Sequence, residues 1–307
     1  MPSIPDLPHR FETTILSTWG DNGRAWLESL PRLIEVVAQR WKLTVRAPLP
    51  SLSYSYAASV VTADGKEAVL KLGVPNPELR TEIAALQAFA DGPVVRLLEA
   101  DAQRGALLLR RLRPGRPLSE MLDDEAATLI AARLVRDVPV PVPRHHAFPS
   151  VEGWARAFDR LRARFDGATG PVPRGMVEKA ERLLEDLRGS CSRDRLLHGD
   201  LHHDNILFDQ RKGWVAIDPK GITGDPAYEA ARLQHNPIPG FLGMGPPRAV
   251  AMRRVEILSE ILREDAVRLL GWAFFDAVLA ACWSIEEDGR RLQYHLRCAE
   301  VFDDLVS

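Results

Sequence analysis

The sequence contains 307 residues, of which 46% are hydrophobic, so the chain can bury a substantial core and its length suggests roughly two domains. Its 40 basic and 42 acidic residues leave a formal net charge of -2, which excludes the strongly basic surface by which proteins bind nucleic acid or an anionic membrane. Three scattered cysteines, an N-terminus without a basic and apolar leader, and the lack of any run near the roughly 20 apolar residues of a membrane span predict a cytoplasmic protein with a small-molecule partner.

The first part of the chain predicts one helical segment followed by strands. Apolar residues at helical spacing predict a helix over 24–41, which Pro31 is expected to break. Strand patterns follow at 44–46, 52–56, 57–62, 67–72, 94–99 and 106–112. The turn Ala63-Asp64-Gly65-Lys66 predicts an antiparallel hairpin from the two strands that flank it. Between the strands, Pro77 opens a helical pattern whose first turns include Glu82.

A segment rich in proline and glycine, Arg113-Pro114-Gly115-Arg116-Pro117, interrupts this pattern and predicts a domain boundary. We therefore expect an N-terminal domain over residues 1–112 and a C-terminal domain over residues 113–307. The second domain is mainly helical by its pattern, with Ser119 and Asp123 as candidate N-caps of its first helix. Further helices are expected at 151–165, 175–188, 248–263, 266–287 and 290–305.

The stretch that carries the chemistry lies between those helices, from Leu196 to Phe208, and a second short apolar run follows it. Its polar residues include Asp200 and Asn205, and Asp218 comes after the next turn. Phosphoryl transfer needs one carboxylate to orient the acceptor hydroxyl and take its proton, and an Asn with a further Asp to hold the magnesium that neutralises the triphosphate. The three residues supply these groups in the order and spacing of a kinase catalytic loop.

Two other interpretations of this stretch are an ordinary solvated loop and a zinc site. Zinc is conceivable because His198, His202 and His203 are potential ligands. It is the weaker idea, since the three cysteines have no paired spacing and the oxygen groups found here are those that magnesium prefers.

The string His198-Gly199-Asp200, with Asn205 and Ile217-Asp218-Pro219, resembles the aminoglycoside phosphotransferase superfamily, a set of small-molecule kinases with the protein-kinase fold. Its continuation, Gly221 to Glu229, resembles the branch of streptomycin 6-kinases, or aminoglycoside/hydroxyurea resistance kinases. The resemblance implies an α+β bilobal fold, with a small antiparallel-sheet lobe and a larger, mainly helical lobe. It also implies ATP and Mg²⁺ as cofactors, with Asp200 as the base and Asn205 and Asp218 as metal ligands.

The same resemblance assigns nucleotide contacts in the first domain. Lys71 would bind the phosphates and Glu82 would position it, although Lys71 also fits an exposed strand lysine and Glu82 also fits a stabilising charge near a helix N-terminus. Backbone groups around Arg111 and Leu112 would lie near the adenine. The sequence departs from the protein-kinase pattern because residues 52–58 lack the glycine-rich loop. Ser53 and Ser55 are the candidate phosphate contacts there, and a plain strand turn fits equally well.

The acceptor site is predicted from the chemistry of streptomycin, whose guanidinium groups call for carboxylates and aromatic faces. The expected contacts are Trp283, Glu286, Glu287, His202 and Asp225. Trp283 and Glu287 also fit a core residue beside a solvated helix end, and His202 also fits an ordinary loop residue. Asp225 also fits a helix cap, and the resemblance implies that it supports the catalytic segment. Alternative acceptors are a cellular amino sugar or choline-like alcohol, and a nucleotide-binding protein without turnover is a third hypothesis. We expect a monomer or a weak homodimer.

Overall fold

The computed structural model describes residues 7–50, 52–191 and 193–306. The chain folds into two compact units. The first contains the residues up to Ala90 together with Val95–Arg113, and the second contains Asp91–Val94 and the residues from Pro114 onward. Residues Asp91–Val94 belong to the second unit because they are hydrogen-bonded to it: Ala216 donates its N–H to the carbonyl of Pro93 at 2.8 Å.

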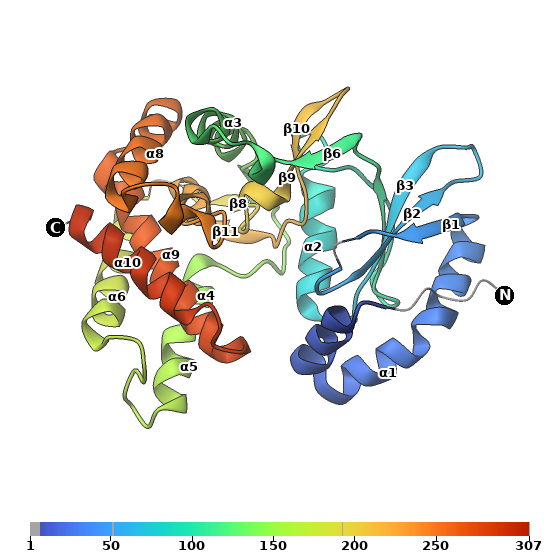
Figure 1. Ribbon diagram of the computed structural model, residues 1–307, viewed down its shortest axis with the longest axis horizontal. Coiled ribbons are helices and arrows are strands. Elements are labelled where there is room, and N and C mark those ends of the chain that lie inside the picture. The colour runs from blue at the N-terminus through green and yellow to red at the C-terminus, as the bar shows by residue number, and fades with distance from the viewer. Residues whose placement is uncertain (1–6, 51, 192, 307) are drawn as a thin grey trace. The chain divides into compact units, whose positions relative to one another are not determined.

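The first unit is an antiparallel sheet with two helices (Figure 1). The strands run in the order β1-β2-β3-β5-β4, and every neighbouring pair is antiparallel. The elements are α1 (His9–Trp41), β1 (Thr44–Pro48), β2 (Tyr56–Val61), β3 (Glu67–Leu72), α2 (Pro77–Ala88), β4 (Leu97–Asp101) and β5 (Ala106–Arg110). The hairpin predicted around Gly65 is therefore confirmed as β2 and β3.

The core of this unit lies between one face of the sheet and α1. Every second residue of β2 and β3 is buried, as the two-residue period of a strand requires. These residues pack with Phe11, Ile15 and Leu30 of α1. Lys71 lies on the other face of β3, because its neighbours Leu70 and Leu72 both belong to the core.

Two sequence predictions for this unit are wrong. Helix α1 continues through Pro31 and instead kinks at Gly20, whose φ of 53° and ψ of -127° are not helical. Pro31 is exposed, so the carbonyl that it leaves without a partner can be solvated, while a continuous buried stripe holds the helix together. Residues 53–55 form bends rather than a strand, Leu52 has no regular structure, and β2 begins at Tyr56.

The second unit combines two small antiparallel sheets with a group of helices. The sheets have the strand orders β10-β9-β6 and β11-β8-β7. The strands are β6 (Pro114–Pro117), β7 (Val140–Pro141), β8 (Arg195–Leu197), β9 (Ile206–Asp209), β10 (Gly213–Ala216) and β11 (Ile222–Gly224). The α-helices are α3 (Asp124–Asp137), α4 (Val151–Ala155), α5 (Ala157–Arg164), α6 (Arg174–Gly189), α7 (Ala231–Gln234), α8 (Pro247–Leu262), α9 (Ala266–Glu287) and α10 (Leu292–Val306). Short 3-10 helices are η1 (Leu118–Glu120), η2 (His203–Asn205), η3 (Pro226–Ala230) and η4 (Gly240–Gly243).

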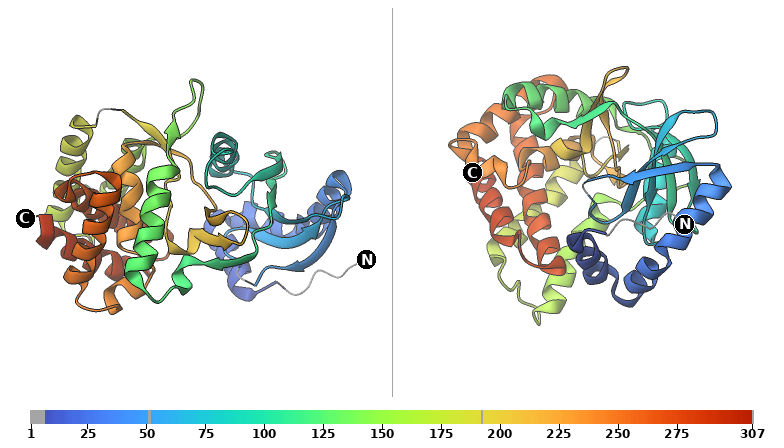
Figure 2. Two further views of the ribbon diagram at one scale, coloured as in Figure 1. Left: turned by 90° about the horizontal axis from the view of Figure 1, so that it is seen from above. Right: turned by 45° about the vertical axis from the view of Figure 1, so that its right-hand side comes forward.

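Helix α9 is the centre of the second unit, and α8 and α10 lie against it (Figure 1 and Figure 2). Within the described part of the chain, it is the one helix long and apolar enough to cross a membrane. However, 78% of its most apolar window is buried inside the structure. Its composition is therefore explained by its place in the core, where it also carries the buried carboxylate of Asp276.

Four histidines of the second unit are buried, and burial lowers their pKa values. The pKa falls to about 4 for His198 and to about 3 for His203 and His295, and it is also lowered for His235. Each group therefore binds a proton more readily in the unfolded chain than in the folded one. Their contribution to stability is present above pH 6.5 and is lost as the pH falls toward the folded values.

We predict that His295→Leu reduces this acid sensitivity. Between pH 7.5 and pH 5, the wild-type free energy of unfolding should fall by about 2 kcal/mol more than that of the variant. Urea denaturation at both pH values measures the difference. The exposed His145 provides the control, since His145→Gln should follow the wild type. Parallel pH profiles for the wild type and His295→Leu would contradict the prediction.

Candidate active site

The turn that carries Asp200 leaves β8, which is paired with β11. Gly199 adopts a φ of +80°, a conformation that glycine favours. A side chain at this position would also lie 2.7 Å from Cγ2 of Ile222 and 3.0 Å from the ring of Trp154. The glycine of the motif is therefore required by backbone conformation and by close packing.

A buried carboxylate, Glu229, holds this turn. Its Oε2 accepts the backbone N–H of His198 at 2.5 Å, and its Oε1 accepts that of Gly199 at 3.0 Å. Burial raises the pKa of Glu229 to about 7, although both N–H groups favour the ionised form. Glu229 is the last residue of the string that resembles the family, and no role was predicted for it. Its function depends on η3 lying beside β8, a tertiary contact that no spacing in the chain predicts.

His198 ties the turn to the segment that precedes Asp218. Its Nε2 lies 2.8 Å from the carbonyl oxygen of Ile217, and its Nδ1 accepts the N–H of Asp200 at 3.2 Å. Both ring nitrogens are therefore engaged, which removes His198 as a zinc ligand. Among the described residues, no group of three or more His, Cys, Asp or Glu side chains is arranged to hold a metal. The zinc alternative thus has no support.

The three residues of the expected catalytic loop are brought together by the β9–β10 hairpin. Asn205 donates Nδ2 to the backbone oxygen of Asp200 at 2.9 Å, and its backbone oxygen accepts the N–H of Ile217 at 2.9 Å. Asp218 follows Ile217 directly and has a φ of 58°, a value uncommon for a residue other than glycine. Because Asn205 uses its amide nitrogen toward Asp200, its side-chain oxygen remains for a cation. This oxygen and the Asp218 carboxylate are donors of the kind that Mg²⁺ prefers.

The expected pair in the first unit is present in the structure. Lys71 donates Nζ to Oε1 of Glu82 at 2.7 Å, and both side chains are only 14% exposed. Helix α2 fixes Glu82, since Asn76 caps the helix by accepting the N–H of Leu79. The acidic residue of the first helical turn is Glu78, so Glu82 is placed for Lys71 rather than for the helix dipole.

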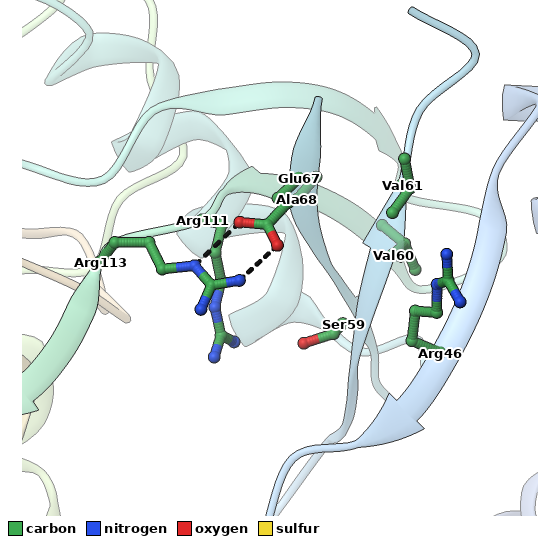
Figure 3. Close-up of a pocket in the computed structure, with 8 residues that line it drawn as sticks. All are labelled: Arg46, Ser59, Val60, Val61, Glu67, Ala68, Arg111 and Arg113. Atoms are coloured by element: carbon green, nitrogen blue, oxygen red, sulfur yellow. Dashed lines mark hydrogen bonds and ion pairs between the residues drawn. The ribbon is translucent and has the colours of Figure 1, made fainter. Parts of the chain in front are cut away.

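A pocket of about 200 Å³ lies beside β2 and β3 in the same unit (Figure 3). Arg111 is among the lining residues, and Arg113 closes one side by donating Nε to Oε2 of Glu67 at 2.8 Å. Leu112, Ser53 and Ser55 are not among the residues that line it. Leu112 is buried, whereas Ser53 is exposed on the segment before β2.

The expected acceptor residues have different surroundings. The ring of Trp283 is half-buried, and the guanidinium of Arg232 covers it at 5.3 Å. Glu286 is held by Arg160 of α5 through two bonds of 2.8 and 3.1 Å. Glu287 is exposed, and desolvation raises the pKa of its carboxyl. His202 lies close to Asp200, with its Nε2 3.8 Å from Oδ1 of that residue.

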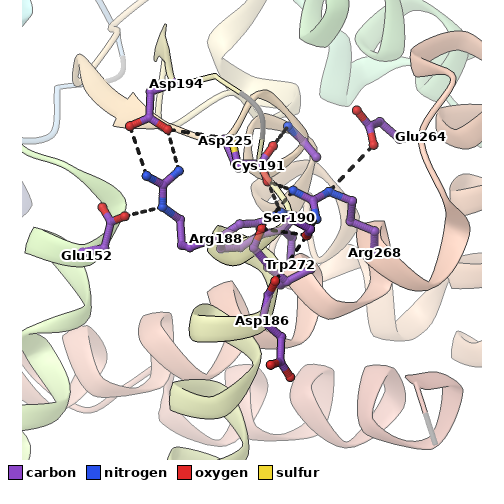
Figure 4. A network of polar contacts seen from close by, with 12 residues as sticks. Glu152, Asp186, Arg188, Ser190, Cys191, Asp194, Asp225, Glu264, Arg268 and Trp272 are labelled. Atoms are coloured by element: carbon purple, nitrogen blue, oxygen red, sulfur yellow. Dashed lines mark hydrogen bonds and ion pairs between the residues drawn. The ribbon is translucent and has the colours of Figure 1, made fainter.

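Asp225 belongs to a structural network instead of an open surface (Figure 4). Its Oδ1 caps η3 by accepting the N–H of Ala227, and its Oδ2 accepts from Arg268 and from the indole of Trp272. The residue is 3% exposed and both oxygens are used. Asp225 therefore has the capping role that was one of its two predicted alternatives, and both of its oxygens have partners within the second unit.

Comparison with known proteins assigns the chain to a family. Residues 40–289 match the family model described as aminoglycoside/hydroxyurea antibiotic resistance kinase. The chain is 32% identical to a streptomycin 6-kinase of Streptomyces glaucescens, over 94% of both chains. It is 33% identical to a hydroxyurea phosphotransferase of Kitasatospora aureofaciens, over 93% of this chain and 82% of the relative.

Solved structures show the same fold at low sequence identity. The choline kinase LicA from Streptococcus pneumoniae aligns with 89% of this chain and 99% of its own, with a TM-score of 0.62 at 14% identity. The second structure is a thermostable mutant of the aminoglycoside phosphotransferase APH(4)-Ia in complex with ADP and hygromycin B. Its alignment covers 89% of this chain and 98% of that chain, with a TM-score of 0.63 at 16% identity. The predicted α+β kinase-like fold is thus confirmed. The chain belongs to the aminoglycoside/hydroxyurea antibiotic resistance kinase family and is a phosphotransferase.

Proposed function

We propose that this protein transfers the γ-phosphoryl group of ATP to a hydroxyl of an aminoglycoside of the streptomycin type, with Mg²⁺. The observation that supports the reaction is the arrangement of Asp200, Asn205 and the Ile217–Asp218 segment, joined by hydrogen bonds. The acceptor is supported by two relatives named streptomycin 6-kinase, each 32% identical to this chain.

In this proposal, the second unit carries the reacting groups. Asp200 orients the acceptor hydroxyl and takes its proton as the phosphoryl group is transferred. The side-chain oxygens of Asn205 and Asp218 would hold Mg²⁺, which would neutralise charge on the phosphates. Glu229 and His198 hold the turn, so that the position of Asp200 is set before substrates bind.

The first unit supplies the nucleotide contacts in this proposal. Lys71 binds phosphate oxygens, and its bond to Glu82 holds its ammonium group in place. Arg111 marks the pocket for the rest of the nucleotide, because it lines the cavity where β5 ends. Leu112 contributes its backbone beside Arg111. Ser53 and Ser55, in the segment before β2, contact the phosphates in this proposal. Ser53 is exposed and Ser55 is partly exposed.

We predict that Glu82→Gln raises the KM for the nucleotide about tenfold and leaves the KM for the acceptor unchanged, because the substitution removes the charge that orients Lys71. Steady-state kinetics with each substrate varied in turn measure both constants. Glu78→Gln is the matched control, since Glu78 is exposed one helical turn earlier in α2. An unchanged nucleotide KM in Glu82→Gln would contradict the role given to the pair.

The proposed acceptor is tested with purified protein, ATP and Mg²⁺ against a panel of streptomycin, other aminoglycosides, hydroxyurea, amino sugars and choline. Mass spectrometry should show streptomycin carrying one added phosphoryl group. Hydroxyurea is the second candidate, because a hydroxyurea phosphotransferase is 33% identical to this chain. Phosphorylation of hydroxyurea, choline or an amino sugar, with streptomycin left unmodified, would overturn the proposed acceptor.

A further inference from the structure

The side chain of Arg232 lies beside the carboxylate of Asp200. This arginine was not predicted from the sequence as part of the site. Arg232 of α7 places its Nε 3.6 Å from Oδ1 of Asp200 and its Nη2 3.3 Å from Oδ1 of Asp276. Its guanidinium lies over the ring of Trp283. The side chain is 15% exposed, so carboxylates and the indole hold most of it away from solvent.

Asp276 is the anion that compensates Arg232, and it is itself fixed. It is 1% exposed, and it accepts from the hydroxyl of Tyr228 at 2.6 Å and contacts Nε2 of His235 at 2.7 Å. These neighbours hold the carboxylate of Asp276 in one orientation. Arg232 is therefore a rigid group and not a mobile surface arginine.

The bond that Arg232 does not make points to its role. Its Nε is buried and has no hydrogen-bond acceptor among the described residues. Leaving such a donor without a partner costs free energy. The Oδ1 of Asp200, at 3.6 Å, lies just beyond hydrogen-bond distance, so a small movement would complete the bond.

The two oxygens of Asp200 have different neighbours. Oδ2 lies 3.5 Å from Nδ2 of Asn205, whereas Oδ1 faces Arg232 and, at 3.8 Å, His202. The amide of Asn205 thus lies on the side of one oxygen and the cation on the side of the other. A charge-assisted bond from Arg232 would fix which oxygen faces the acceptor hydroxyl.

We propose that Arg232 is a positioning residue for the reaction: held by Asp276 and Trp283, it completes a bond to Asp200 in the reacting complex and orients the catalytic carboxylate. This inference rests on the proposed function, in which Asp200 is the base. A salt bridge that served only to stabilise the fold would satisfy Asp276 and would not need Nε to face Asp200.

Arg232→Lys tests the proposal, because lysine keeps the charge for Asp276 and lacks Nε. We expect kcat to fall about a hundredfold, as for a misplaced catalytic group, while the KM for the nucleotide stays within about twofold. Arg253→Lys is the matched control, since Arg253 is an exposed arginine that also pairs with a carboxylate, Glu125. A folded Arg232→Lys protein that retains more than half of the wild-type kcat would overturn the proposal.

If Arg232→Lys does not fold, a double variant replaces it. Arg232→Met with Asp276→Asn removes both charges together, so no unpaired charge is buried. The same hundredfold loss of kcat is expected, and a folded double variant that retains more than half of the wild-type kcat would overturn the proposal.

The ratio of variant to wild-type turnover tests the positioning role, whereas the identity of the wild-type product tests the proposed function. If the wild type phosphorylates no acceptor of the panel, the ratio is measured on ATP hydrolysis, in which water is the acceptor. A loss there supports the role of Arg232 even though the proposed acceptor has failed, and an unchanged rate overturns it.

Discussion

Asp200→Asn is expected to lower kcat by about a thousandfold, because asparagine keeps the shape of the side chain and cannot take a proton from the acceptor hydroxyl. The KM for the nucleotide should change by less than about twofold, since the proposed nucleotide contacts lie on other residues. The turn itself should survive, because the backbone of Asp200 makes the bonds to His198 and Asn205. Initial rates at saturating ATP and acceptor, with a thermal melt of each protein, measure the effect.

Asp204→Asn is the control for this experiment. Asp204 is a carboxylate on the same loop, 57% exposed, and it accepts a hydrogen bond from Ser119 of η1. Its loss should leave kcat within about twofold of the wild type, as expected of a surface substitution. If Asp200→Asn retained more than about a tenth of the wild-type kcat, Asp200 would not be the base of the reaction.

The arrangement that could be predicted from sequence is the one at the open end of a single hairpin. Asp200, Asn205 and Asp218 lie close along the chain, and the β9–β10 register fixes how they return to one another. The Lys71–Glu82 pair could likewise be predicted from sequence, since the two residues lie on a strand and on the helix that follows it. Local patterns sufficed because few residues separate the partners.

Partners from distant elements could not be predicted in the same way. Trp283 and Glu287 are four residues apart and share a helix face, which suggested an aromatic surface for a guanidinium group of the acceptor. In the structure, a guanidinium from the protein itself, that of Arg232, covers the ring of Trp283. The Arg232–Asp276 pair joins α7 to α9, and no periodicity in the sequence links those two residues.

The fold, like the site, could be predicted where the interacting residues lie close together in the sequence. Periodicity found the hairpin of β2 and β3, because alternation and turn residues act over short distances. It failed at Pro31, where the propensity of one residue was overruled by the buried stripe of α1. Tertiary packing decided the outcome there, and sequence spacing contains little information about packing.

Glu229→Ala should be the most destabilising of the substitutions considered. The carboxylate accepts the N–H groups of His198 and Gly199 in a buried site, so its removal leaves two buried donors without an acceptor. At about 1 to 3 kcal/mol for each group, the free energy of unfolding should fall by about 2 to 6 kcal/mol. Because the released turn leads directly into Asp200, kcat of the folded fraction should also fall, by about a hundredfold. Urea denaturation and initial rates below the unfolding transition measure the two effects.

Glu229→Gln separates shape from hydrogen bonding in the same position. Glutamine fills the same volume and can accept one of the two N–H groups, but its own amide donor then faces the other. We therefore expect an intermediate loss of stability together with a loss of kcat. Glu256→Ala, which removes an exposed carboxylate from α8, should change neither quantity. A Glu229→Ala protein with wild-type kcat would show that the turn holds Asp200 in place without this carboxylate, and an undiminished free energy of unfolding would show that the two N–H groups find other acceptors.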